Sequence, residues 1–157
     1  MSRLWNDRLQ TGIDSIDTQH KVLCQAVDAL VELLGGEHKE SEVEHFLKCL
    51  ITYARVHFRE EEETFRAAGL PETEIRMQMF DHFQFEDVVR GLEHRWRSGE
   101  RDVAGVAEKM AQRWVKAHME ALDLPMVEEV LRRQAFGSRS MAKNQDQSES
   151  TSCFSTK

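Results

Sequence analysis

Proline is scarce in this chain of 157 residues, where it occurs only twice, at positions 71 and 125. Valine and isoleucine do not gather in alternating runs, so the pattern of a half-buried β-strand is missing. No apolar run approaches the roughly 20 residues of a membrane-spanning helix, and the N-terminus lacks the apolar segment of a signal peptide. These absences argue against a β-rich fold and a membrane protein, and they favour an all-α protein.

The chain has fewer basic than acidic residues, and it has few cysteines. The formal net charge is −7 and the pI is about 5.5, which argues against nucleic acid or an anionic membrane as a partner. The three cysteines have no metal-binding or redox spacing: we expect Cys24 and Cys49 on apolar helix faces and Cys153 in a polar tail. The sequence therefore predicts a cytoplasmic protein with reduced thiols, which is a monomer or has a protein partner that the sequence does not identify.

Apolar residues recur every three or four positions along four stretches, residues 17–34, 41–67, 72–96 and 102–122. Four amphipathic helices with short connections predict an antiparallel up-down-up-down four-helix bundle, preceded by an N-terminal arm over residues 1–17. We expect Pro125 to perturb the chain, and a short further helix can form over residues 126–135. The predicted division is a bundle domain over residues 1–136 and a disordered, serine-rich C-terminal tail over residues 137–157.

A histidine and a glutamate lie one helical turn apart on the second of these helices. His57 and Glu61 are four residues apart, so both project from one face, in a stripe that otherwise contains Phe46, Leu50 and Tyr53. An imidazole and a carboxylate in such a stripe need partners, because burying them unpaired costs several kcal/mol. The pair alone leaves two equal alternatives, a metal site and a hydrogen-bonded core histidine.

Each of the other predicted helices also carries a polar group on its apolar face. The complete set is His20, His57, Glu61, Gln78, His82, His118 and Asp123. In an antiparallel bundle, an early residue of one helix lies level with a late residue of the next, so all seven fall at the same end. Packing alone does not predict this agreement, and the sequence therefore predicts a metal site.

The donor types narrow the choice of metal. Imidazoles with two carboxylates suit first-row metals of the iron type, and zinc also fits. Four imidazoles and two carboxylates exceed what one tetrahedral zinc ion requires. Two metal ions bridged by Glu61 and Asp123 would use the whole set, since each carboxylate has two oxygens.

Four segments of the chain resemble the hemerythrin family, and in particular the bacteriohemerythrins. They are LWNDRLQTGIDSIDTQHKVL, HFREEEETFRAAGLP, DHFQF and WVKAHMEALD, and the resemblance covers about residues 4–124. It implies a non-heme di-iron centre, two iron ions with a bridging oxo or hydroxo group. It assigns the ligands as follows: His20 and His57 to one ion, His82 and His118 to the other, and Glu61 and Asp123 as bridges. It also implies that dioxygen is the ligand, because family members bind it reversibly and carry, store or sense it.

One position departs from the family pattern. The family has a histidine four residues before the one at His82, where this chain has Gln78, and two extra residues follow Pro71. In this alignment we expect Gln78 to be a weak ligand through its amide oxygen. An alternative alignment makes His82 the first ligand and Glu86 the second, but it requires a larger insertion.

Three functions are compatible with these residues. The first is a non-enzymatic di-iron protein that binds dioxygen as a carrier, store or sensor. The second is a di-iron redox enzyme, such as a peroxidase or a nitric-oxide-reducing protein, that exploits the incomplete ligand set. The third is an interaction module that uses metal as a structural staple. An enzyme would lack an obvious proton donor unless Glu86 turns inward, so we expect a dioxygen-binding protein that is not an enzyme.

Overall fold

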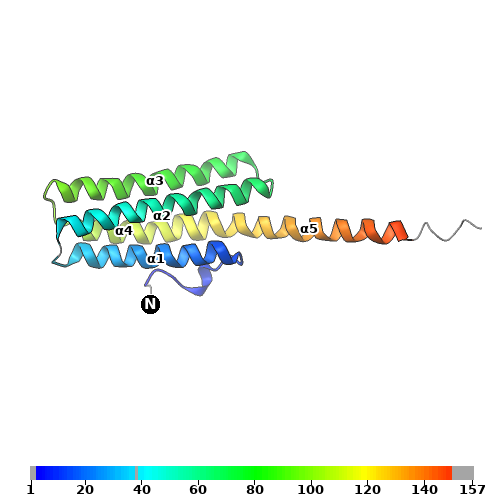
Figure 1. Cartoon of the computed structure of the whole chain (residues 1–157), viewed down its shortest axis with the longest axis horizontal. Helices are drawn as coiled ribbons and strands as arrows, with labels where there is room; N and C mark the ends of the chain where they lie inside the picture. Colours follow the sequence, from blue (N-terminus) through cyan, green and yellow to red (C-terminus); the bar gives the residue numbers. More distant parts are fainter. Residues whose placement is uncertain (1–2, 38, 150–157) are drawn as a thin grey trace, which may run out of the picture.

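The structure is a computed structural model that describes residues 3–37 and 39–149. Its helices are α1 (Asp14–Gly35), α2 (Glu40–Ala67), α3 (Glu72–Arg97) and α4 (Ala104–Trp114), after which the chain continues as a π-helical segment, η2 (Val115–Asp123), and as α5 (Leu124–Glu149). Figure 1 shows α1, α2, α3 and α4 side by side. The predicted all-α, antiparallel four-helix bundle is confirmed.

Short connections reverse the chain between successive helices. Gly69 follows α2 with a φ of +71°, and Gly99 follows α3 with a φ of +90°. Residues with a Cβ rarely adopt this left-handed backbone conformation, so glycine can end a helix there without strain. Each connection thus folds the next helix back against the one before it.

The core of the bundle consists of two apolar clusters. The larger one includes Leu23, Val27, Leu47 and Val89, and it fills most of the length of the bundle. The smaller one lies at the end where α1 begins and α2 finishes, and it consists of Ile16, Phe65, Leu70, Ile75, Met126, Val127 and Val130. The seven predicted site residues lie between the two clusters along the helices, so apolar side chains separate them from water in both directions.

The buried face of α2 differs in part from the predicted stripe. Val43 and Leu47 are buried, whereas Phe46 is only half-buried. Cys24 lies in the core as predicted, but the prediction for Cys49 is wrong, because this residue is exposed. An α-helix turns about 100° per residue. The predicted apolar stripe is centred one residue away from the observed buried face of α2, and this difference places Cys49 on the exposed side.

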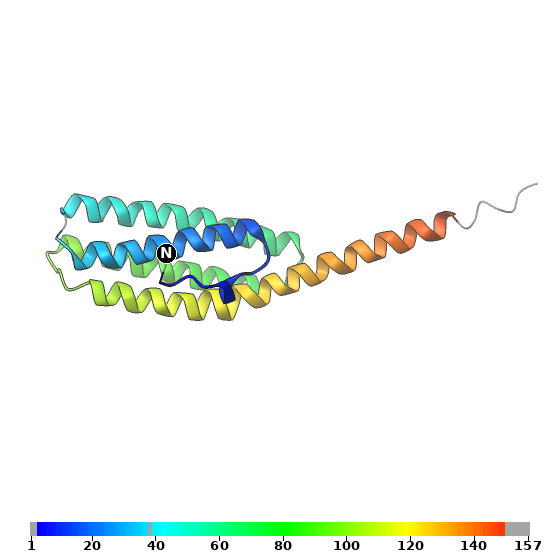
Figure 2. The same ribbon diagram turned by 90° about the horizontal axis from the view of Figure 1, so that it is seen from below.

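The N-terminal arm is tied to the start of α1 by one buried carboxylate. Asp17 is 3 % exposed. It accepts hydrogen bonds from Thr11 N at 2.7 Å, from Thr11 Oγ1 at 2.8 Å and from Gly12 N at 3.1 Å. Leu9, in a short 3₁₀ helix (Asp7–Leu9), is fully buried in the larger cluster. Figure 2 shows the arm running beside α1 and the α4–α5 helix.

Replacing Asp17 with alanine is expected to lower the free energy of unfolding by about 1–3 kcal/mol, because the half-buried Thr11 and the Gly12 N–H lose their acceptor. Asp14→Ala is the matched control, since Asp14 is an exposed acidic residue in the same first turn of α1. Denaturant unfolding of both variants measures the difference. Equal losses in the two variants would mean that the arm does not depend on Asp17.

Pro125 does not interrupt the last helix, which continues from η2 directly into α5. The N–H of Leu124 bonds to the carbonyl oxygen of Met119, five residues back, so the hydrogen-bond ladder is already shifted where proline lacks its N–H. Helix α5 therefore continues directly and passes through position 137, where the predicted disordered tail begins. Residues 150–157 of that tail lie outside the described residues, and the division of the chain after residue 136 stays a prediction.

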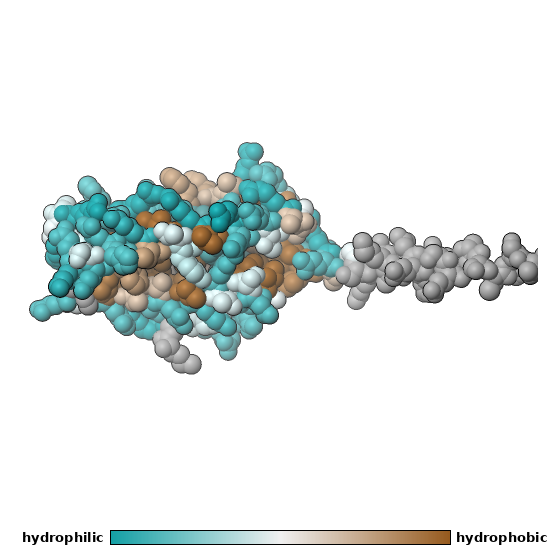
Figure 3. Space-filling view, in the orientation of Figure 1, coloured by the Kyte–Doolittle hydropathy of each residue, from teal (hydrophilic) through white to brown (hydrophobic). Residues whose placement is uncertain are grey.

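Hydrophilic residues cover most of the face of the bundle seen in Figure 3, with small apolar patches between them. Among the side chains that the structure describes, the most exposed large apolar ones belong to Met77, Phe80, Phe83 and Phe136. Across the described ranges, no helix is both long enough and apolar enough to cross a bilayer.

Candidate metal centre

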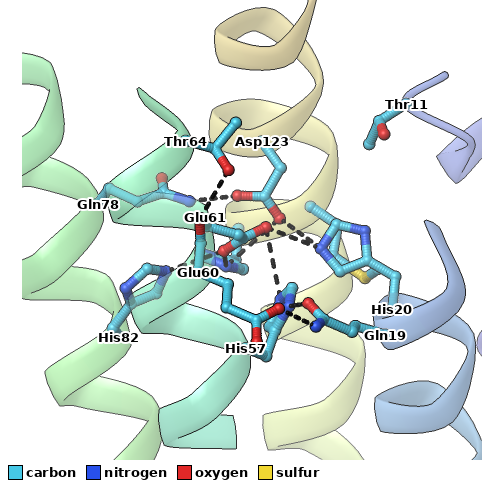
Figure 4. Close-up of polar contacts among 12 residues, drawn as sticks. Thr11, Gln19, His20, His57, Glu60, Glu61, Thr64, Gln78, His82 and Asp123 are labelled. Atoms are coloured by element: carbon cyan, nitrogen blue, oxygen red, sulfur yellow. Dashed lines mark hydrogen bonds and ion pairs between the residues drawn. The ribbon is translucent and has the colours of Figure 1, made fainter. Parts of the chain in front are cut away.

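Four helical segments each contribute buried polar side chains to one point in the bundle. The set is His20 on α1, His57 and Glu61 on α2, Gln78 and His82 on α3, and His118 and Asp123 on η2. None of these residues is more than 4 % exposed. Figure 4 shows the labelled members converging between the helices. The structure thus brings together every residue of the predicted site.

The π-helical segment explains how His118 and Asp123 reach the same point. On an α-helix, residues five apart differ by about 500° in direction, so they face about 140° apart. A π-helix has hydrogen bonds between residues five apart, which places such residues one wide turn apart on the same face. His118 and Asp123 both lie in η2 and are both fully buried. The pairs on α2 and α3 have the ordinary four-residue spacing instead.

Glu61 divides its two oxygens between two pairs of histidines. Its Oε1 lies 3.1 Å from His20 Nε2 and 3.4 Å from His57 Nε2. Its Oε2 lies 3.3 Å from His82 Nε2 and 3.9 Å from His118 Nε2. Two clusters that could each hold a metal ion result, and Glu61 is the residue that they share.

Asp123 also faces both pairs, but it does so with a single oxygen. Its Oδ2 lies 3.2 Å from His20 Nε2 and 3.3 Å from His118 Nε2. Its other oxygen, Oδ1, accepts a hydrogen bond from the Gln78 amide nitrogen. The two carboxylates therefore lie between the clusters in different ways.

Several polar atoms at this point have no hydrogen-bond partner among the described residues. They are His57 Nε2, His82 Nε2, His118 Nε2, Glu61 Oε2, Asp123 Oδ2 and Gln78 Oε1. Buried polar atoms are nearly always hydrogen-bonded, and each exception needs a physical reason. Imidazole nitrogens and carboxylate oxygens that approach one another without hydrogen bonding are the arrangement that a metal ion satisfies. The residues present therefore fit a pair of metal ions.

The outer nitrogens of three histidines contact side chains outside this cluster. His57 Nδ1 lies 2.8 Å from Gln19 Oε1. The Gln19 amide nitrogen in turn donates to Glu60, which turns the amide oxygen towards the imidazole. His57 therefore carries its proton on Nδ1 and presents the lone pair of Nε2 to the cluster.

The outer nitrogens of the other two histidines, His82 and His118, contact carboxylates. His82 Nδ1 lies 2.9 Å from Glu62 Oε1, and His118 Nδ1 lies 2.9 Å from Asp81 Oδ2. Glu62 is half-buried, because α3 passes close enough to α2 for this contact. Such partners fix the orientation of a ligand imidazole and increase its basicity. Sequence spacing did not identify them, since each contact joins two different helices.

Aromatic side chains pack against the histidines of the cluster. Phe58 stacks on His82 with ring centres 3.9 Å apart and planes 7° apart. Trp114 stacks on His118 at 5.5 Å and contacts Phe85 at 4.9 Å. These rings keep water away and restrict rotation of the imidazoles. Trp114 is itself buried and thus helps to close the core around the site.

Three buried histidines of the cluster differ in the direction in which their surroundings shift the pKa. Burial lowers the pKa of His57 to about 4. Burial also disfavours the charged form of His20 and His82, but hydrogen bonds to carboxylates outweigh it and raise the pKa of His20 to about 9 and of His82 to about 8. Burial would raise the pKa of Glu61, yet the surrounding histidines hold it well below its usual value. An imidazole binds metal in its neutral form, so His57 is ready to bind without losing a proton.

Glu86, the ligand of the alternative alignment, lies away from the cluster. Its Oε2 accepts a hydrogen bond from Arg55 Nε at 2.8 Å and contacts Arg55 Nη2 at 2.7 Å. Gln78 instead occupies the position one turn before His82 and is fully buried at the cluster. The geometry therefore agrees with the first alignment, while the roles of these residues in metal binding stay predictions.

Comparison with known proteins agrees with this geometry. Residues 11–128 match the hemerythrin HHE cation binding domain. The chain is 28 % identical over 127 residues to a bacteriohemerythrin of Pseudomonas paraeruginosa, covering 81 % of this chain and 80 % of that one. It is 27 % identical over 129 residues to one of Stenotrophomonas maltophilia, with the same coverage. It is also 30 % identical over 69 residues to one of Clostridium acetobutylicum, covering 42 % of this chain and 54 % of that one. No solved structure gives a significant match. A domain match over most of the chain, with histidines and carboxylates gathered inside a four-helix bundle, means that the chain belongs to the hemerythrin family.

Proposed function

We propose that this is a non-heme di-iron protein that binds dioxygen reversibly, as an oxygen carrier, store or sensor. The observation that carries the proposal is the position of Glu61 between two histidine pairs, with one carboxylate oxygen towards each. A single metal ion does not need this division. Two ions that share a bridging carboxylate do need it, because the bridge must reach both.

The residues that would hold the two ions follow from the two clusters. They are His20 and His57 for one ion, His82 and His118 for the other, and Glu61 and Asp123 for both. Imidazole and carboxylate donors without thiolates suit iron. When bound, a pair of ferrous ions supplies two electrons to dioxygen together.

The protein's own side chains support binding without turnover. Gln19, Glu62 and Asp81 hold three imidazoles by their outer nitrogens, so the ligands need little rearrangement. Among the described residues, the buried carboxylates are Asp17, Glu61 and Asp123, and Asp17 is bound to the arm. A turnover reaction would need a further proton donor inside the site. A cytoplasmic location, as the sequence predicts, belongs to the same proposal.

The test is to load the metal-free protein with ferrous iron under nitrogen, to admit oxygen, and to follow the visible absorption spectrum. We expect a new band with oxygen that disappears when oxygen is removed and returns over several cycles. Rapid, irreversible conversion to a ferric form with turnover of added peroxide or nitric oxide would contradict reversible binding and favour a redox enzyme.

Replacing Asp81 with alanine is expected to weaken metal binding by about 10–100-fold, because His118 loses the carboxylate that orients it. Competition with a chromophoric chelator measures the change. The control is Asp87→Ala, which removes an exposed carboxylate from the same helix. If both variants bind iron equally well, Asp81 has no part in holding the ligand.

A further inference from the structure

The Gln78 amide is the one polar group of the cluster that is neither an imidazole nor a carboxylate. It lies one turn before His82 on α3 and is fully buried. Its nitrogen donates a hydrogen bond to Asp123 Oδ1, while its oxygen has no partner within the described residues. Figure 4 shows the nitrogen pointing to Asp123 and the oxygen pointing away from it.

The orientation of this amide follows from the chemistry of its neighbour. An ionised carboxylate only accepts hydrogen bonds, so an amide beside it must turn its NH₂ group towards it. The reverse orientation would place two electron-rich oxygens against each other in a buried site, at a high electrostatic cost. Asp123 therefore determines which end of Gln78 faces inward, and that end carries no lone pair for a metal.

The same hydrogen bond determines what Asp123 presents to the histidines. Asp123 Oδ1 is held by Gln78, and Oδ2 alone lies near both His20 and His118, at 3.2 and 3.3 Å. Because Oδ2 faces one histidine of each pair, any rotation of the Asp123 carboxylate changes both clusters together.

We propose that Gln78 is a positioning residue for Asp123 rather than a metal ligand. The inference rests on the proposed function, because the carboxylate that Gln78 holds is a proposed bridge. It replaces the expectation that the amide oxygen coordinates iron. Each ion then has two imidazoles, and the effect of Gln78 reaches both ions through Asp123.

The experiment compares Gln78→Leu with the wild-type protein by calorimetric titration of the metal-free protein with cobalt(II) alone, without oxygen. Gln78→Met, which keeps an unbranched side chain of similar length, serves as a second variant if the first fails to fold. The control is Gln84→Leu, which replaces an exposed amide on the same helix. We expect both cobalt-binding steps to weaken by about 10–100-fold, as for the loss of other groups that orient a ligand. Weakening of one step alone would identify Gln78 as a ligand of one ion and overturn the proposal.

A double-mutant cycle with Asp123→Ala separates the two roles further. If Gln78 acts through Asp123, Gln78→Leu changes cobalt affinity little in the Asp123→Ala background. If Gln78 is itself a ligand, Gln78→Leu weakens cobalt binding in that background as well. The same cycle is run on the melting temperature of the metal-free protein. There we expect Gln78→Leu to lower the melting temperature only when Asp123 is present.

The metal-free cycle also separates this inference from the proposed function. A wild-type protein that binds no cobalt and no iron would contradict the di-iron proposal, while the melting temperatures would still decide whether Gln78 and Asp123 act as a unit. Additive effects in both cycles would overturn the inference.

Discussion

Replacing Glu61 with alanine is expected to remove both iron ions, so that anaerobically loaded protein retains less than one iron per chain. The reason is that Glu61 is shared by the two clusters and offers one oxygen to each. His57→Ala, by contrast, removes a donor from one cluster only, and we expect it to retain about one iron. Iron analysis after gel filtration measures both variants.

The control for this prediction is Glu63→Ala, which removes an exposed carboxylate two residues further along α2. Circular dichroism checks that each variant is folded, and Glu61→Gln repeats the test with a side chain of the same size. If Glu61→Ala keeps one iron as tightly as the wild-type protein, Glu61 belongs to one ion and is not a bridge.

Iron binding is expected to raise the melting temperature by about 15 °C or more. Each ion at 1,000 times its Kd stabilises the folded protein by about 4 kcal/mol, and a chain of this size gains about 2–4 °C per kcal/mol. The effect arises because the ligands lie on four separate helical segments and meet only in the folded bundle. Calorimetry under nitrogen, with and without ferrous iron, measures the shift.

The metal-free protein should remain helical, since the apolar clusters on either side of the site do not depend on metal. Calcium is the control ion, because it prefers oxygen donors to imidazoles. Equal melting temperatures with and without iron would show that the site does not bind metal in the folded protein.

The helices and the convergence of the site were predictable because they depend on local patterns. Apolar periodicity predicts where helices form, and glycine predicts where they end, as Gly69 and Gly99 do with positive φ. The level of each polar residue along its helix follows from counting in an antiparallel bundle. His20, near the start of α1, therefore had to lie near Glu61, late in α2, and the two are 3.1 Å apart.

The remaining features depend on backbone geometry and on the approach of neighbouring helices. Residue propensities do not predict the π-helical segment. Its one sequence signal is the five-residue spacing of His118 and Asp123. The contact between Glu62 and His82 depends on how closely α2 and α3 pack, which a one-helix pattern does not contain. The role of Gln78 likewise follows from its contact with Asp123 on another helix.

The most direct test of the central claim is a crystal structure of the anaerobically iron-loaded protein, with an anomalous difference map measured at the iron absorption edge. The account predicts two peaks on either side of the Glu61 carboxylate, within about 4 Å of each other, as in other two-metal sites. One peak should lie beside His20 and His57, and the other beside His82 and His118. A single peak, or iron bound away from Glu61, would contradict it.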